Sequence, residues 1–263
     1  MKLKTGIALV GTLVALATIG LVFWGFSNSW LSAGIVVGLS LLLYILGAIG
    51  CSGTPGSFEE FCRGACIGLN AGCNGFIGFT VYGLIFGSTG GIILGSVCAL
   101  ITLLTVFGPI SQNEFFQGIA GWLTWFLPMS WLIVGVGFLF LVLSVLGAAI
   151  TFWQVRFLSI KGIRVDWKTG TFFIKGGWIA NLNYLHTAFN MGNFSFVDKQ
   201  SGDWHIDHEA GHTLNLTAFG SLFHLWGALD ENVLPNRGHQ AYSELIAESN
   251  VPGTTISVIP MWK

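Results

Sequence analysis

The stretch from Met129 to Arg164 reads MSWLIVGVGFLFLVLSVLGAAITFWQVRFLSIKGIR, and the chain changes character within it. The 263 residues include 11 basic and 12 acidic ones, about 9% in all, against about 25% in typical soluble domains. Six of these charges precede position 156: Lys2, Lys4, Glu59, Glu60, Arg63 and Glu114. The other 17 lie within residues 156–263. We therefore predict a transmembrane helical domain over residues 1–155 and a water-facing domain over 156–263.

Apolar stretches in the first half have about the length of roughly 20 residues that crosses a bilayer. They cover residues 6–26, 31–51, 65–87, 90–108 and 129–152. The segment 112–128, with Trp122 and Trp125, fits the interface or a re-entrant position. The first stretch ends in Phe-Trp-Gly-Phe and not at a small-residue cleavage site, so we expect a retained helix. The sequence predicts a multi-pass protein with four to six crossings.

Basic residues flank both ends of the apolar half. Lys2 and Lys4 precede the first stretch, and Arg156, Lys161 and Arg164 follow the last. Cytoplasmic flanks of membrane spans are enriched in Lys and Arg. If both clusters are cytoplasmic, the number of crossings is even and the C-terminal domain faces the cytoplasm. Five crossings would place it on the other side.

Composition excludes several function classes. The charges nearly balance and no basic run exists, which argues against nucleic acid as a partner. The apolar stretches instead predict the lipid bilayer as a partner. All five cysteines lie before residue 100 without a CxxC pair, so neither a thiol-bound zinc site nor a disulfide framework is expected. No charged residue lies at the middle of a span, as an ion relay would require. Glycines such as Gly64, Gly68 and Gly72 indicate close helix packing.

The second half mixes strand and helix patterns. Residues 157–180 alternate in a way typical of two strands joined by a turn at 166–170, and residues 193–197 form another short alternating run. A helix is expected from about Asp203 to Phe219, ended by Gly220, and a second helix over 240–249. These patterns predict a small α+β domain.

The first of these helices carries His208-Glu209-Ala210-Gly211-His212, which is an H-E-x-x-H pattern. Residues i and i+4 lie on one helix face, so two imidazoles can bind one Zn²⁺ at about 2.0–2.1 Å. Glu209 lies beside that face, where it can take a proton from a metal-activated water. The pattern therefore predicts a zinc site with His208 and His212 as ligands and Glu209 as general base.

The third ligand decides the subclass. The longer pattern H-E-x-x-H-x-x-G-x-x-H fails here because positions 215 and 218 hold Asn and Ala. With Glu244 and Glu248 on the next helix, residues 204–250 resemble gluzincin metallopeptidases, and the membrane half makes the membrane-embedded, CAAX-prenyl-protease-like group the most similar. The resemblance implies a zincin-like fold in which Glu244 is the third ligand and Glu248, where the family usually has Asp, orients a ligating histidine.

Other third ligands remain open on the residues alone. They are Asp230, which lies 18 residues after His212, and Glu231, Glu248, His224 and His239. A group that stabilises the charge on the tetrahedral intermediate is also expected, with Tyr242, His239 and His224 as candidates.

These residues predict a membrane-bound zinc metalloendopeptidase that hydrolyses a protein or peptide substrate lying along an edge strand such as 193–197. Two alternatives belong to other classes. One is a non-catalytic membrane protein with a structural or metal-sensing domain, and the other is a glycine-rich pore with a regulatory domain, which the lack of charge in the spans disfavours.

Overall fold

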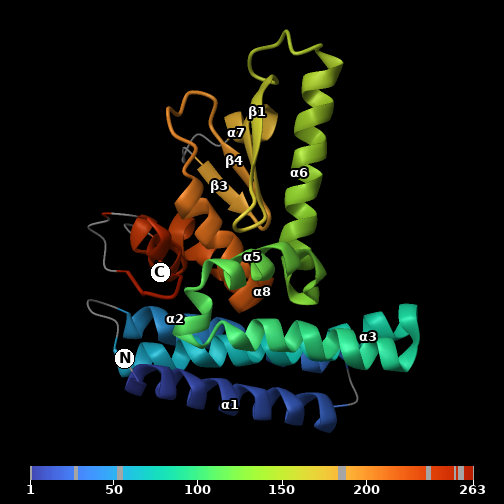
Figure 1. Ribbon diagram of the computed structural model, residues 1–263, viewed down its shortest axis with the longest axis vertical. Helices are drawn as coiled ribbons and strands as arrows, with labels where there is room; N and C mark the ends of the chain where they lie inside the picture. The colour runs from blue at the N-terminus through green and yellow to red at the C-terminus, as the bar shows by residue number, and fades with distance from the viewer. Residues whose placement is uncertain are drawn as a thin grey trace.

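The first half of the chain consists of long apolar helices. A computed structural model describes residues 2–26, 29–51, 56–182, 188–234, 238–251, 253 and 258–262. Helices α1 (Lys2–Gly25), α2 (Ser29–Gly50) and α3 (Ser57–Leu104) lie side by side (Figure 1). The predicted stretches 6–26 and 31–51 fall within α1 and α2. Ser27 and Asn28, in the predicted turn between them, lie outside the described residues.

Helix α3 folds back on itself at Gly87, which takes φ 76° and ψ 172° and so has a left-handed φ that suits glycine. Its two arms correspond to the predicted stretches 65–87 and 90–108. A Cβ on Gly95 would lie 2.7 Å from the backbone nitrogen of Phe79, and one on Gly91 would lie 2.5 Å from the carbonyl oxygen of the same residue. The arms therefore touch through backbone, as small-residue packing predicts.

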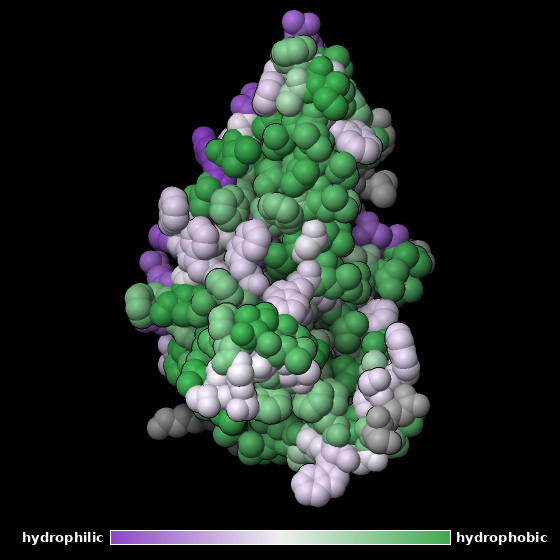
Figure 2. Space-filling model, turned by 90° about the vertical axis from the view of Figure 1, so that its right-hand side faces the viewer, coloured by the Kyte–Doolittle hydropathy of each residue, from purple (hydrophilic) through white to green (hydrophobic). Residues whose placement is uncertain are grey.

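Helix α6 (Trp131–Ile150) is the most apolar of the long helices, and it stands upright above α1–α3, crosswise to their direction (Figure 1). Figure 2 views the molecule from the side of α6 and shows a broad hydrophobic surface. Leu132, Phe138, Leu139, Leu146 and Ile150 are exposed on this helix. Four described helices are long and apolar enough to cross a membrane, within Thr5–Gly25, Ser29–Gly50, Ser57–Leu104 and Pro128–Ile150. These helices fit an integral membrane protein.

Short elements connect α3 to α6 where the sequence indicated an interfacial or re-entrant segment. They are α4 (Gly108–Ser111), α5 (Glu114–Leu123) and the 3-10 turns Thr124–Phe126 and Pro128–Ser130. Helix α5 begins after Asn113, whose side-chain oxygen accepts the backbone N–H groups of Phe115 and Phe116.

A four-stranded mixed sheet packs against α6. The strands are β1 (Ile160–Asp166), β2 (Thr171–Gly176), β3 (Ala188–Met191) and β4 (Phe194–Val197), in the order β1-β2-β4-β3, and β2 and β4 are parallel. The predicted turn at 166–170 is confirmed between β1 and β2. Strand β4 lies inside the sheet, so the prediction of an edge strand at 193–197 is wrong. The edge strands are β1 and β3, and β3 follows the short helix α7 (Trp178–Leu182).

Helix α8 (Ile206–Val233) is longer than predicted. It begins three residues after Asp203, because the Oδ1 atom of Asp203 accepts the N–H groups of Trp204 and His205 and holds the chain in a turn. Gly220 takes φ 77° and ψ 178° and breaks the helix there, but helical structure resumes and continues to Val233. Helix α9 (Tyr242–Ala247) lies between 3-10 turns at Gly238–Gln240 and Glu248–Asn250, within the predicted range 240–249.

Candidate metal centre

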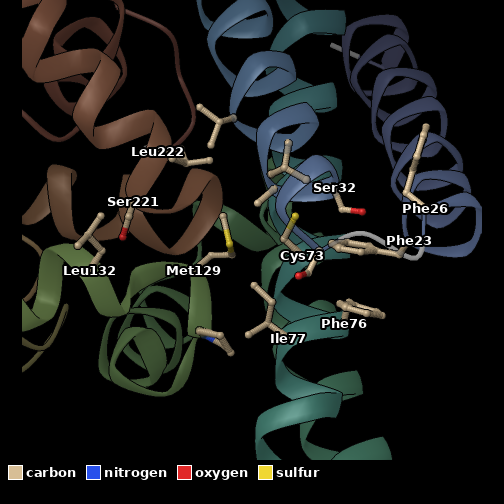
Figure 3. Close-up of a pocket in the computed structure, with 15 residues that line it drawn as sticks. Phe23, Phe26, Ser32, Cys73, Phe76, Ile77, Met129, Leu132, Ser221 and Leu222 are labelled. Atoms are coloured by element: carbon tan, nitrogen blue, oxygen red, sulfur yellow. The ribbon is translucent and has the colours of Figure 1, made fainter.

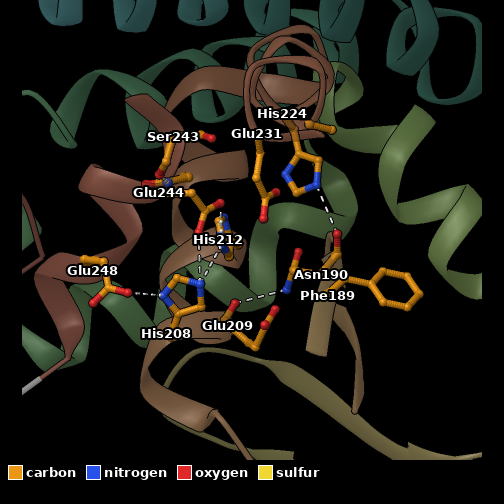
Figure 4. Close-up of polar contacts among 12 residues, drawn as sticks. Phe189, Asn190, His208, Glu209, His212, His224, Glu231, Ser243, Glu244 and Glu248 are labelled. Carbon is orange, nitrogen blue, oxygen red and sulfur yellow. Dashed lines mark hydrogen bonds and ion pairs between the residues drawn. The ribbon is translucent and has the colours of Figure 1, made fainter. Parts of the chain in front are cut away.

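Three side chains from α8 and α9 converge on one point (Figure 4). His208 and His212 lie one turn apart on α8, and their Nε2 atoms are 3.2 Å apart. Glu244 reaches both from α9, with Oε2 3.1 Å from Nε2 of His208 and Oε1 3.2 Å from Nε2 of His212. The structure thus brings together the three residues that were predicted as ligands.

The arrangement fits a small divalent cation. Two ligand atoms at about 2.0–2.1 Å from a tetrahedral zinc ion lie about 3.4 Å apart. The observed separations of 3.1–3.2 Å between ligand atoms are close to that value. Two imidazoles and one carboxylate with an open fourth position are the donor set of many catalytic zinc sites. Within the described part of the chain, no other group of three such side chains lies this close together.

Helices α8 and α9 approach closely because residue 211 is glycine. A Cβ at Gly211 would lie 2.5 Å from the carbonyl oxygen of Ala247 and 3.0 Å from its Cα. One turn further along α8, Nδ2 of Asn215 donates to the carbonyl oxygen of Ser243 at 3.1 Å. These contacts position α9 so that Glu244 faces the two histidines.

Glu248 lies on the other side of His208, one turn after Glu244. Its Oε1 is 3.1 Å from Nδ1 of His208, although it lies off the axis of the ring N–H. Burial disfavours the charged imidazole of His208, but the nearby carboxylates of Glu244 and Glu248 outweigh burial and raise its pKa to about 11. Burial likewise disfavours charge on His212, yet Glu244 raises its pKa. The carboxylates therefore favour the positively charged form of both histidines.

Glu209, the general base that the sequence predicts, lies in the same pocket as this group. Its side chain is 3% exposed and lines the same pocket, and its Oε2 is buried with no hydrogen-bond partner among the described residues. Its carbonyl oxygen accepts from Nδ2 of Asn190 on β3, at 3.0 Å. A buried carboxylate oxygen without a partner is costly, so this atom calls for a partner that the described residues do not provide.

The pocket around these residues has a volume of about 820 Å³. Its walls come from α8, α9 and strand β3, and an apolar side is added by α6 and α7 through Phe140, Ile179 and Leu182. A second pocket of about 660 Å³ lies between the N-terminal helices and α8 (Figure 3). None of its lining residues is Asp, Glu, His, Lys or Arg, so it offers no comparable chemistry.

His224 is a candidate for charge stabilisation that the structure places in the pocket. Its ring lies 6.1 Å from that of His212, and its Nε2–H donates to the carbonyl oxygen of Asn190 at 3.0 Å. Burial and then His212 lower its pKa to about 4, so the ring is neutral at pH 7. With the proton on Nε2, Nδ1 is an acceptor. His224 in this state suits an N–H group of a substrate better than an oxyanion.

Tyr242 was also predicted to stabilise the oxyanion, and its position does not support that role. The ring is fully buried, it is absent from the pocket wall, and its hydroxyl donates to Oε1 of Glu59 at 2.7 Å. Asp230 is likewise outside the group of possible ligands, and Glu231 lines the pocket without joining that group. The side chain of His239 lies outside the described residues.

Asn190 contributes to the site but was not predicted from the sequence. Its side chain donates to the carbonyl oxygen of Glu209 and to Oγ1 of Thr213, at 3.0 and 3.2 Å, which fixes β3 against α8. Residues 188–191 show no alternation of apolar and polar side chains, so no local signal marked them as a strand. Comparisons with protein-family models, with curated proteins and with solved structures find no match to this chain.

Proposed function

We propose that the chain is a membrane-bound metallopeptidase of the gluzincin type, in which His208, His212 and Glu244 hold a Zn²⁺ ion. The observation that carries the proposal is the convergence of these three side chains in one pocket with Glu209, whose Oε2 has no hydrogen-bond partner among the described residues. A bound Zn²⁺ ion would polarise the scissile carbonyl group and make a water molecule acidic enough to be deprotonated near pH 7.

Glu209 has the position and the environment of a general base. Its carboxylate lies one residue after His208, and its Oε2 has no competing hydrogen bond within the described chain. It can take a proton from the attacking water and pass it to the amine that leaves. Glu248 supports this chemistry indirectly. Its carboxylate lies beside Nδ1 of His208, where it orients the ring and makes Nε2 a stronger metal ligand.

Strand β3 offers the place for an extended peptide. It pairs with β4 on one side only, and its residues line the pocket. The carbonyl oxygen of Asn190 points away from β4, since it accepts from His224. A peptide lying along this edge would bring its scissile bond past Glu209, with bulky apolar side chains facing Phe140 and Leu182. This moves the proposed substrate strand from 193–197 to 188–191.

We also propose that the metal centre faces the cytoplasm. Arg156, Lys161 and Arg164 directly follow α6, and cytoplasmic flanks of membrane helices are enriched in such residues.

Glu209→Gln tests the enzymatic proposal. The variant keeps the size of the side chain and should retain one zinc per chain, but it should lose a factor of roughly 10²–10⁴ in the hydrolysis rate, because the amide cannot accept the proton. Glu231→Gln, another carboxylate of the pocket, is the matched control and should stay active. Zinc measured by mass spectrometry and cleavage of a casein-type substrate give the two readouts. Bound zinc without Glu209-dependent cleavage would favour the non-catalytic alternative.

A further inference from the structure

A buried polar cluster lies immediately behind the metal ligand on α9. It consists of Tyr44 from α2, Glu59 from α3, Asp230 from α8 and Tyr242 from α9, and we call it the anchor cluster. All four side chains are buried, with relative exposures from 0 to 5%. The cluster thus joins two helices of the membrane half to both helices of the metal centre.

Asp230 is the centre of the anchor cluster. Its Oδ2 accepts the hydroxyl of Tyr44 at 2.9 Å and the backbone N–H of Tyr242 at 3.0 Å. The hydroxyl oxygen of Tyr44 in turn accepts the N–H of Ser243 at 3.4 Å. The first N–H groups of a helix have no partner within the helix. Asp230 and Tyr44 therefore satisfy the two backbone groups that directly precede Glu244.

The side chain of Tyr242 ties the same segment to α3. Its hydroxyl donates to Oε1 of Glu59, and Arg63 pairs with Glu59 at 3.7 Å. A Cβ at Gly47 of α2 would lie 2.8 Å from the Tyr242 ring, so that glycine allows the ring to lie directly on α2.

We propose that Asp230 and Tyr44 are positioning residues for the metal ligand Glu244, through which the membrane helices set the geometry of the metal centre. The proposal rests on the metal site described above. Ser243, which carries the last anchored N–H, directly precedes Glu244, so a shift of the anchor moves the ligand. Metal–ligand distances tolerate only about 0.2 Å. The same contacts explain why Asp230 is buried without being a ligand.

The test uses the full-length protein in detergent or nanodiscs, with zinc affinity measured against a competing chelator and the absorption spectrum recorded after Co²⁺ substitution. Asp230→Ala should weaken zinc binding by about tenfold and change the Co²⁺ spectrum. Asp230→Asn, which keeps an acceptor oxygen, should restore most of the affinity. Tyr44→Phe should give an intermediate loss and serves as the second variant if Asp230→Ala does not fold.

Tyr82→Phe is the matched control. Tyr82 also lies in the membrane half and also donates its hydroxyl, to the carbonyl oxygen of Phe126, but far along the chain from the anchor cluster. The Tyr82→Phe variant should lower the melting temperature without changing the zinc affinity. It therefore distinguishes a loss of ligand positioning from a general loss of stability. Folded Asp230→Ala and Tyr44→Phe proteins with wild-type zinc affinity and Co²⁺ spectra would overturn this inference alone. A wild-type protein that binds no zinc would overturn the metal centre as well.

Discussion

Gly211→Ala tests whether the close approach of α8 and α9 sets the metal site. The new Cβ would lie 2.5 Å from the carbonyl oxygen of Ala247, where ordinary contacts begin near 3.4 Å, so the helices must separate by about 0.9 Å. Backbone atoms on both sides cannot rotate away. A shift of that size is several times the tolerance of about 0.2 Å for a metal ligand, and it acts on the helix that carries Glu244.

The substitution should lower the free energy of unfolding by no more than about 2 kcal/mol, because two effects partly cancel. Overpacking costs about 1–3 kcal/mol, and replacing a helical glycine by alanine returns about 1 kcal/mol. We therefore expect a folded Gly211→Ala protein whose zinc affinity is at least about tenfold weaker. Chelator competition measures the affinity and thermal unfolding measures the stability. Gly38→Ala on α2, where no atom lies within 4 Å of the new Cβ, is the control. Wild-type zinc affinity in Gly211→Ala would refute the reasoning.

Two further predictions concern the charges around the histidines. Glu248→Gln should weaken zinc binding by about 10–100-fold, because His208 loses its charged partner. Chelator competition measures the dissociation constant, and an unchanged value would contradict the role assigned to Glu248. Zinc affinity should also rise between pH 7 and 9, by about tenfold per pH unit for each proton displaced, since the pKa of metal-free His208 is raised to about 11. An unperturbed imidazole, with a pKa of about 6.5, would give a flat profile over that range, and zinc titrations at three pH values distinguish the two.

Local periodicity explains what the sequence could predict about the site. His208 and His212, like Glu244 and Glu248, are pairs four residues apart, and any helix places such pairs on one face. The same rule explains why Tyr242, which was predicted to stabilise the oxyanion, lies outside the pocket wall. It precedes Glu244 by two residues, which is about 200° around a helix, so its side chain points away from the pocket toward Glu59.

Non-local contacts explain what the sequence could not predict. Strand β3 has no periodic pattern of its own, and it becomes the pocket edge because it pairs with β4 and because Asn190 bonds to α8. Gly220 carries the positive φ typical of a residue that follows a helix end. Helical structure nevertheless resumes beyond it, since Phe223 packs against Tyr44 of α2 and the indole N–H of Trp226 donates to Oγ of Ser40.

The change of composition near residue 156 marks a boundary of solvent exposure and not a boundary of packing. Buried hydrogen bonds cross it from Asn70 to the carbonyl oxygen of Thr217, and from Tyr44 to Asp230. Each buried polar group would cost free energy if its partner were removed, so these contacts oppose separation of the two halves. Charge distribution along a sequence reports which segments meet water. It does not report which segments share a core, and here α8 and α9 share theirs with α2 and α3.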